Sequence, residues 1–285
     1  MALITMDDIE NMSPIFKGKF GHCLANTLVK ILGVGKLSEI YSLYEHLSGP
    51  DFIDHYLKHL KINYKVAGIE NLVSLKTQPF ITISNHPYGA LDGLMIIDVI
   101  GHFREDYKVM VNNFLSLVKT MCCNFISVKP DFKTTKITAD SIRGIRKAIA
   151  HLKEGHPLGL FPAGAVSDLS LRDRCVRDRK WQESAIALIK KAKVPVVPVR
   201  FFDRNSNLFY CIGLINSTLR VLRLPREVLN KSKKLIRVGI GEPISVEQQA
   251  QFDSIESFGA FLRDSVYGMA LPENFILRNE LSFDL

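Results

Sequence analysis

Strand-like and helix-like segments alternate along the chain from residue 63 onward. Short apolar runs rich in β-branched residues are followed by longer stretches whose apolar residues lie three and four positions apart. Strands are predicted at 64–66, 80–84, 108–112, 124–128, 157–161, 194–201, 208–211 and 235–240. Helices are predicted at 90–103, 114–122, 139–154, 181–193 and 254–269. This alternation predicts an α/β fold with a mixed, mostly parallel sheet and helices on both faces.

The residues before position 63 favour helices alone. Their apolar residues form three stripes at helical spacing: Leu24, Leu28, Ile31 and Leu32; Ile40, Leu43, Tyr44 and Leu47; and Phe52, Tyr56, Leu57 and Leu60. Lysines flank the first stripe, so it is either a basic helix lying in a lipid interface or part of a helical hairpin packed on the main domain. We therefore divide the chain into an N-terminal helical segment, 1–62, and an α/β domain, 63–285.

The composition limits the partners. Of the 285 residues 47% are hydrophobic, and the formal net charge of +8 favours anionic partners such as lipid head groups, nucleic acid or an acidic carrier protein. The aromatic residues are not interleaved with the basic clusters, which argues against a nucleic-acid groove. No run approaches the roughly 18 apolar residues that a spanning helix needs. The five cysteines form no C-x-x-C pair, so we expect no metal site and a reducing, cytoplasmic setting.

A histidine follows the strand predicted at 80–84, and an aspartate follows it across a turn. His86 comes directly after Ser84-Asn85, and Asp92 falls in the first turn of the helix that begins at Ala90. An imidazole with a carboxylate behind it can accept a proton from a hydroxyl that attacks a carbonyl group. The alternative is a buried histidine that only hydrogen-bonds a backbone carbonyl at the end of a strand.

A second turn follows the strand predicted at 157–161. It reads Phe161-Pro162-Ala163-Gly164, and a sharp turn of this kind brings backbone N–H groups close to a ligand. Such amides can stabilise an oxyanion or hold a phosphate. A basic cluster comes next: Arg172, Arg174, Arg177, Arg179 and Lys180. It either attracts anionic groups or is a solvated loop whose charges pair with Asp168, Asp173 and Asp178.

Taken together, these motifs resemble the glycerolipid acyltransferase family of 1-acylglycerol-3-phosphate and lysophospholipid acyltransferases. The resemblance rests on Asn85–Gly93, on Phe161–Ser167 and on Val194–Val199, in that order. It is closer to the bacterial hemolysin-like branch, which includes enzymes that O-acylate lyso-ornithine and lyso-glycine lipids.

The resemblance implies an O-acyltransferase of membrane lipid biosynthesis, with no bound cofactor. The donor would be an acyl thioester on acyl carrier protein or coenzyme A, the acceptor a lyso-lipid, and the location the cytoplasmic side of the membrane, peripherally. His86 and Asp92 would be catalytic. The residues expected to bind substrate are Asn85, Lys129, Phe161, Pro162, Ala163, Gly164, Arg200 and Arg204.

Two departures from the family pattern bear on the acceptor and on the geometry. The wider family has four residues between its histidine and aspartate, whereas five intervene here, so the turn at 87–89 must absorb one more. The wider family also has glutamate where this chain has Ala163, which favours a lyso-aminolipid over 1-acylglycerol 3-phosphate. A non-catalytic lipid-binding protein is the alternative from another class, and the intact His86–Asp92 pair argues against it.

Overall fold

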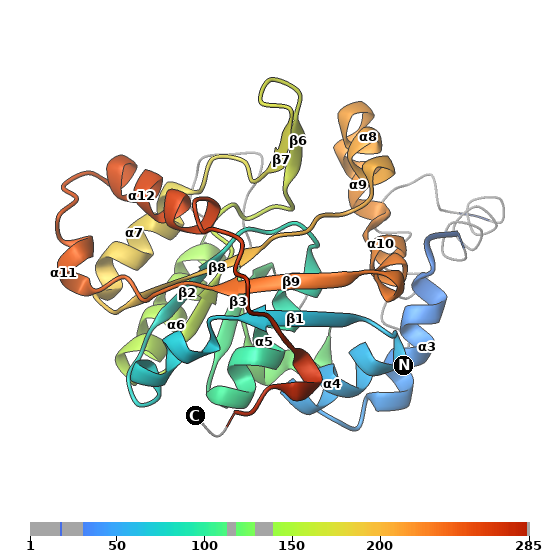
Figure 1. Ribbon diagram of the computed structural model, residues 1–285, viewed down its shortest axis with the longest axis horizontal. Helices are drawn as coiled ribbons and strands as arrows, with labels where there is room; N and C mark the ends of the chain where they lie inside the picture. Colours follow the sequence, from blue (N-terminus) through green and yellow to red (C-terminus); the bar gives the residue numbers. More distant parts are fainter. Residues whose placement is uncertain (1–17, 19–30, 113–117, 129–138, 284–285) are drawn as a thin grey trace.

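The structure is a computed structural model that describes residues 18, 31–112, 118–128 and 139–283 (Figure 1). A sheet of eight strands runs through it in the order β10-β1-β9-β8-β2-β5-β3-β4. The strands of this sheet are β1 (Asn63–Ala67), β2 (Ile81–Ser84), β3 (Lys108–Asn112), β4 (Phe125–Val128), β5 (Leu158–Leu160), β8 (Val196–Phe201), β9 (Leu235–Ile240) and β10 (Ile276–Leu277). Neighbouring strands are parallel except in the pairs β8–β9 and β1–β10, so the predicted mixed, mostly parallel sheet is confirmed.

Strand β2 lies inside the sheet and determines where its edge groups meet. It pairs in parallel with β5 on one side and with β8 on the other. All four of its residues are fully buried, as expected for a parallel strand covered on both faces. Since parallel strands end at the same edge, the segments that follow β2, β5 and β8 come together there.

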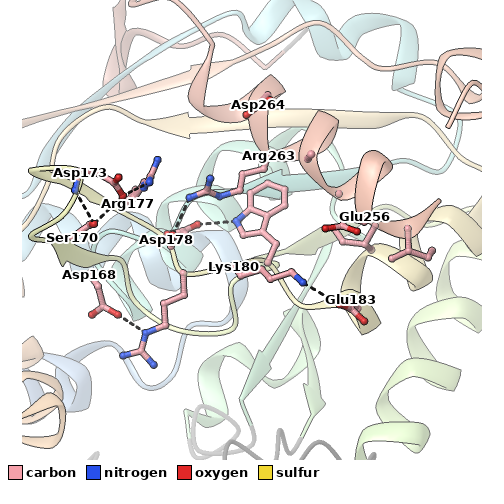
Figure 2. Close-up of a pocket in the computed structure, with 16 residues that line it drawn as sticks. Asp168, Ser170, Asp173, Arg177, Asp178, Lys180, Glu183, Glu256, Arg263 and Asp264 are labelled. Carbon is pink, nitrogen blue, oxygen red and sulfur yellow. Dashed lines mark hydrogen bonds and ion pairs between the residues drawn. The ribbon is translucent and has the colours of Figure 1, made fainter. Parts of the chain in front are cut away.

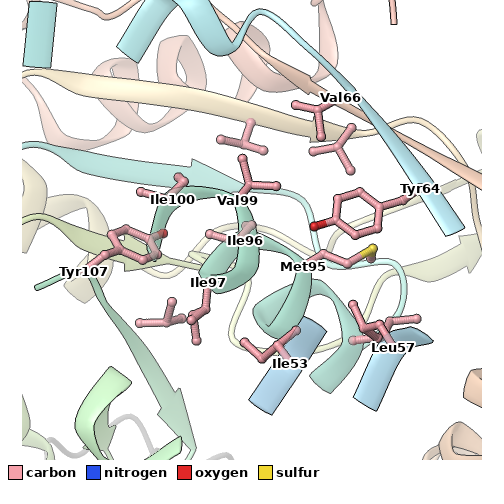
Figure 3. Packing of buried hydrophobic residues seen from close by; sticks show 14 of the residues in the cluster. Ile53, Leu57, Tyr64, Val66, Met95, Ile96, Ile97, Val99, Ile100 and Tyr107 are labelled. Atoms are coloured by element: carbon pink, nitrogen blue, oxygen red, sulfur yellow. The ribbon is translucent and has the colours of Figure 1, made fainter. Parts of the chain in front are cut away.

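Helices cover both faces of the sheet. The α-helices of the described residues are α3 (Val34–Tyr44), α4 (Gly49–His59), α5 (Ala90–Phe103), α6 (Ala139–Lys153), α7 (Glu183–Ala192), α8 (Asn207–Ile215), α9 (Ser217–Leu222), α10 (Leu224–Asn230), α11 (Val246–Gln249) and α12 (Ile255–Tyr267), and several of them cover the sheet. On one face, α4 and α5 pack on β1, β3 and β9 in the core that Figure 3 shows around Tyr64, Met95 and Ile96. On the other face, α6, α7 and α12 pack on β2, β4 and β5.

The N-terminal helices that the structure describes belong to the main core. Phe52, Ile53 and Leu57 of α4 are buried in the same cluster as α5. The second and third predicted stripes therefore pack on the main domain, and the choice between a lipid-interface helix and a packed hairpin stays a prediction for the first stripe. Most of the first predicted stripe, including Leu24 and Leu28, lies outside the described residues. No helix in the described ranges is both long enough and apolar enough to cross a bilayer.

One predicted strand is wrong. Residues 208–211 lie in helix α8, which begins after Ser206, whose hydroxyl accepts a hydrogen bond from the Phe209 N–H at 3.2 Å. Among the described residues this apolar run pairs with no strand, and periodicity alone does not distinguish a short apolar strand from a helix. Of the helix predicted at 114–122, residues 114–117 lie outside the described residues, and Lys119–Asn124 forms a 3₁₀ helix.

The sequence patterns also missed a two-stranded hairpin. Strands β6 (Asp168–Ser170) and β7 (Cys175–Arg177) pair with each other apart from the main sheet. Each strand has only three residues, which is too short for an apolar alternation to be recognised. In Figure 1 this hairpin and the helices α8 and α9 project from the same side of the sheet.

Candidate active site

The segments that follow β2 and β5 bring an imidazole and an aromatic ring together. His86 comes two residues after the end of β2, and Phe161 comes directly after the end of β5. Their ring centroids lie 4.3 Å apart. His86 keeps 18% of its side chain exposed, so the imidazole lies at a surface and is not sealed in the core.

His86 and Asp92 form the pair that the sequence predicts. Nδ1 of His86 lies 2.9 Å from Oδ2 of Asp92. The approach is oblique, since Nδ1 has no partner at hydrogen-bonding angles. Side chains of this kind commonly align fully only when a substrate is bound. Because Nδ1 faces the carboxylate, Nε2 is the ring nitrogen that is available for proton transfer.

The turn between β2 and α5 absorbs the additional residue. Gly89 has φ 73° and ψ −131°, a backbone conformation that is accessible essentially only to glycine. The Gly89 carbonyl accepts the Asp92 N–H at 3.0 Å, and Oδ2 of Asp92 accepts the Tyr88 N–H at 2.8 Å. The aspartate is thus held by the turn that it follows, and the pair closes despite five intervening residues.

Asp92 is a buried and incompletely satisfied carboxylate. Its side chain is fully buried, and Oδ1 has no hydrogen-bond partner. Burial raises the pKa of Asp92, while the neighbouring His86 opposes that rise. This carboxylate therefore depends on His86 and on one backbone N–H for its compensation.

A second buried carboxylate, Asp178, holds the backbone of His86. One of its oxygens, Oδ1, accepts the His86 N–H at 3.2 Å and the Ser167 hydroxyl at 2.6 Å. The other, Oδ2, accepts the Trp181 indole N–H at 3.2 Å. Arg263 donates to the Asp178 carbonyl at 3.0 Å, and Figure 2 shows both residues in the wall of a cavity of about 560 Å³. Asp178 thereby fixes the position from which the imidazole projects.

The turn after β5 is rigid. Gly164 has φ 64°, and its N–H donates to the Phe161 carbonyl at 2.9 Å. The Pro162 carbonyl accepts the Gln182 N–H at 2.9 Å. The Gly164 amide is therefore used within the turn and is not free to bind a ligand.

A smaller cavity, of about 290 Å³, borders the residues on either side of His86. Its wall includes Asn85, Pro87, Arg174, Arg200 and Arg204. The cavity lies between the residues next to His86 and a group of cationic side chains. Its volume is enough for part of a substrate but not for a whole lipid.

Comparison with known proteins identifies the family. A family model described as "Acyltransferase" matches residues 22–272. The chain belongs to this acyltransferase family. The predicted family and the prediction of an acyltransferase enzyme are confirmed, and the alternative of a non-catalytic lipid-binding protein loses its support.

Two curated relatives and one solved structure show similarity to this acyltransferase. The lyso-glycine lipid O-acyltransferase of Bacteroides thetaiotaomicron is 29% identical over 77% of this chain and 79% of its own length. The lyso-glycine lipid O-acyltransferase of Phocaeicola vulgatus is 26% identical over 77% of this chain and 77% of its own length. The crystal structure of the 1-acyl-sn-glycerophosphate acyltransferase PlsC from Thermotoga maritima covers 76% of this chain and 78% of its own, with 17% identity and a TM-score of 0.46.

The polar residues predicted to bind substrate differ in how far their side chains are already used in hydrogen bonds to other parts of the protein. Asn85 uses both ends of its amide on the Phe201 backbone, at 2.9 and 2.8 Å, and so joins the ends of β2 and β8. Arg200 donates to the carbonyls of Tyr267 and Met269, whereas Arg204 is exposed and donates to Asn207 at 3.3 Å. Substrate contact stays a prediction for all three, and Arg204 has the most freedom to make it.

The remaining predicted residues lie as follows. Phe161 packs on the imidazole, while Pro162 and Ala163 are buried behind it. Lys129 lies outside the described residues. No group of three or more histidine, cysteine, aspartate or glutamate side chains is placed to hold a metal ion in the described ranges.

The basic cluster after the Phe161–Gly164 turn is partly neutralised. Arg177 pairs with Asp173, as Figure 2 shows. Arg179 pairs with Asp168. For these two arginines the solvated-loop alternative is correct. Arg172 and Arg174 are exposed at the turn between β6 and β7.

Sequence reasoning missed two residues that position the site. Asp178 was counted only as a possible partner of the basic cluster, and nothing in its neighbourhood marks a contact with a backbone N–H 92 positions earlier. Asn205 donates to the Pro87 carbonyl at 2.9 Å and so supports the turn from the β8 side. Its place in the sequence, between Arg204 and Ser206, gives no sign of this contact.

Proposed function

We propose that this acyltransferase moves a fatty acyl group from an acyl thioester to the hydroxyl of a lyso-aminolipid, of the lyso-glycine-lipid class. The His86–Asp92 pair at the end of β2 is the observation that carries the proposal. The names of the two relatives and the alanine at position 163 support the choice of acceptor.

In the proposed reaction His86 is the general base. Its Nε2 takes the proton of the acceptor hydroxyl while the oxygen attacks the thioester carbonyl carbon. Asp92 orients the ring and stabilises the imidazolium that forms. When the tetrahedral intermediate collapses, the carbon–sulfur bond breaks and His86 returns the proton to the thiolate. The products are an ester and a free thiol.

The turn after β5 supplies the proposed oxyanion donor. In the part of the chain that the structure describes, the Ala163 amide donates to no protein acceptor, in contrast to that of Gly164. An N–H held rigidly beside the reacting carbonyl stabilises negative charge without reorganisation. Arg204 and Arg174, in the wall of the neighbouring cavity, would bind the anionic part of the acceptor or donor.

The alternative acceptor is 1-acylglycerol 3-phosphate, because the same arginines suit a phosphate. Acyl carrier protein and coenzyme A are both candidate thiols of the donor. The proposal places the enzyme peripherally at the cytoplasmic side of the membrane, where lyso-lipids are available.

Release of free thiol tests the reaction and the acceptor together. Acyl-coenzyme A and acyl carrier protein thioester are each offered with lyso-glycine lipid, lyso-ornithine lipid or 1-acylglycerol 3-phosphate. We expect thiol release with the lyso-aminolipids and a matched ester product by mass spectrometry. Turnover confined to 1-acylglycerol 3-phosphate would contradict the proposed acceptor.

His86→Ala tests the base. We expect the transfer rate to fall by about 10³-fold or more, because no other group takes the hydroxyl proton. The melting temperature should stay close to that of the wild type, because the ring is partly exposed at the rim of the site. Near-normal turnover by a folded His86→Ala variant would exclude the mechanism.

A further inference from the structure

Helix α8 presents apolar side chains to solvent on several sides. Phe209 and Tyr210 are buried, but Leu208, Leu214 and Ile215 are 54, 48 and 86% exposed. In the adjoining helix α9, Leu219 and Val221 are 54 and 49% exposed. Single exposed apolar residues are ordinary, but a helix that is apolar all round and lies at the surface usually faces another apolar phase.

The charged side chains within residues 204–226 have one sign. Two of them pair with acidic residues outside this stretch, Arg220 with Asp168 and Arg223 with Glu227. No residue between Arg204 and Arg220 is charged, and from 204 to 226 the chain contains four arginines and no acidic residue. Arg204 and Arg226 are exposed. An uncharged apolar centre with cationic edges is complementary to an anionic lipid surface.

The tip of the β6–β7 hairpin extends the same surface. Leu171 is 69% exposed and precedes the exposed Arg172. The hairpin and the helices form one body, because Leu169 and Val176 pack with Phe209 and because Arg220 pairs with Asp168. Figure 1 shows both projections on one side of the sheet.

These projections flank the edge that holds His86. The β6–β7 hairpin follows β5 and α8 follows β8, the two strands that pair with β2. Ser167, at the start of the hairpin segment, donates its N–H to the His86 carbonyl at 2.9 Å, and Asn205, just before α8, donates to the Pro87 carbonyl.

We propose that α8, α9 and the β6–β7 turn form the surface by which this protein docks on a lipid bilayer. The docking surface consists of Leu171, Arg172, Leu208, Leu214, Ile215, Leu219 and Val221. Its apolar side chains enter the boundary between head groups and acyl chains. Arg172 and the exposed arginines at its edge, Arg204 and Arg226, contact anionic head groups. The inference rests on the proposed function, because an enzyme whose acceptor remains in the bilayer needs its catalytic edge turned to that bilayer. It assigns docking to this surface, whereas the sequence offered lipid contact of the first N-terminal stripe as one of two alternatives.

Vesicle sedimentation of the full chain tests the docking surface. The probes are phosphatidylcholine vesicles with and without phosphatidylglycerol. The variant combines Leu214→Gln, Ile215→Gln and Leu219→Gln, and we expect its partition coefficient to fall by at least about tenfold. The matched control combines Leu43→Gln, Val73→Gln and Ile276→Gln, at residues that are 58, 46 and 44% exposed elsewhere, and should bind as the wild type does. Binding of the wild type should strengthen with phosphatidylglycerol and weaken with salt.

Each other outcome has a defined meaning. If the triple variant sediments with vesicles as the wild type does, the docking surface is refuted. If sedimentation velocity shows a wild-type dimer that the variant converts to a monomer, with vesicle binding unchanged, the surface joins two copies of the chain and the proposal is wrong. Should the triple variant fail to fold, the single Ile215→Asn variant at the most exposed position is decisive, with an expected loss of about threefold.

Activity separates this inference from the proposed function. The triple variant should keep wild-type turnover on lyso-lipid dispersed in detergent micelles, and His86→Ala should bind vesicles as the wild type does. If no lyso-lipid is acylated by the wild type but vesicle binding still depends on Leu214, Ile215 and Leu219, then the docking surface stands and the proposed function fails.

Discussion

Helix α5 carries two buried carboxylates, Asp92 and Asp98. They differ in how many hydrogen-bond donors surround them. Asp98 is surrounded by donors: Arg278 donates to both of its oxygens at 2.7 and 2.6 Å, and the Tyr64 hydroxyl donates to one of them at 2.5 Å. Nδ1 of His102 lies 3.3 Å away. Asp92 has one backbone N–H and one histidine, and its Oδ1 has no partner.

The pKa values of the two groups move in opposite directions. Burial by itself would raise the pKa of Asp98, but hydrogen bonds from His102 and Arg278 hold it below its ordinary value. Burial raises the pKa of Asp92, and His86 only partly compensates. A carboxylate that is neutralised by a fixed guanidinium fastens β1, α5 and the C-terminal segment together. A carboxylate whose main partner is an imidazole can stabilise the positive charge that forms when that imidazole takes up a proton.

The same substitution, aspartate to asparagine, at both positions tests whether Asp92 serves the reaction and Asp98 the stability of the fold. For Asp92→Asn we expect the rate of acyl transfer to fall by about 10³-fold, because an amide no longer stabilises the imidazolium. The melting temperature should change little. Steady-state kinetics with a saturating donor measure the loss, and an unchanged rate would show that the pair has no role in the reaction.

Asp98→Asn should give the reverse result. It removes the nearer anion of the partly buried Arg278, whose other carboxylate partner, Asp54, lies 3.8 Å away, so the free energy of unfolding should fall by about 3 kcal/mol. The turnover of the folded enzyme should stay within about twofold of the wild type. Urea denaturation monitored by tryptophan fluorescence measures the stability, and a loss of activity without a loss of stability would reverse the roles assigned to the two carboxylates.

Gly89→Ala sharpens the comparison by disturbing the turn that holds Asp92. A Cβ at Gly89 would require a strained backbone and would lie 3.3 Å from Leu224, so we expect about a tenfold lower turnover number. The control is Gly155→Ala, where φ is 92° and no atom lies within 4 Å of the added Cβ. That variant should lose about 1 kcal/mol of stability and keep its turnover. Equal turnover numbers for Gly89→Ala and Gly155→Ala would mean that strain at Gly89 does not change the geometry of the His86–Asp92 pair.

The smallest expected effect is a pH dependence of stability at the Asp98 cluster. The hydrogen bond to Asp98 raises the pKa of His102. A raised pKa means that this stabilisation is fully present below the ordinary histidine pKa of about 6.5 and is lost as the pH rises through the folded value. The stability advantage of the wild type over His102→Gln should therefore decrease as the pH rises from about 6 to about 9. A constant difference, measured by urea denaturation across that range, would exclude the coupling.

The local features of the site could be predicted because each is encoded by neighbouring residues. The apolar run of β2, the turn-forming Pro87 and Gly89, and the helical spacing after Ala90 lie within one stretch of chain. That stretch alone places a histidine beyond a buried strand and a carboxylate in the first helical turn. The alternation of such stretches likewise determined the α/β class and most of the strands.

Contacts between distant segments were decided only by the tertiary structure. Asp178 holds His86, Asn85 joins β8, and Arg200 binds carbonyls beyond α12, in each case because the strand order brings together residues that lie far apart in the sequence. Residues 208–211 form a helix because the Ser206 hydroxyl caps it and no strand of the described ranges pairs with them, which outweighs local β propensity. The sequence by itself determined which groups could react. The packing of the sheet decided which of them are held in place, which are used for structure, and which remain free to bind a substrate, because burial and pairing depend on the neighbours that the fold supplies.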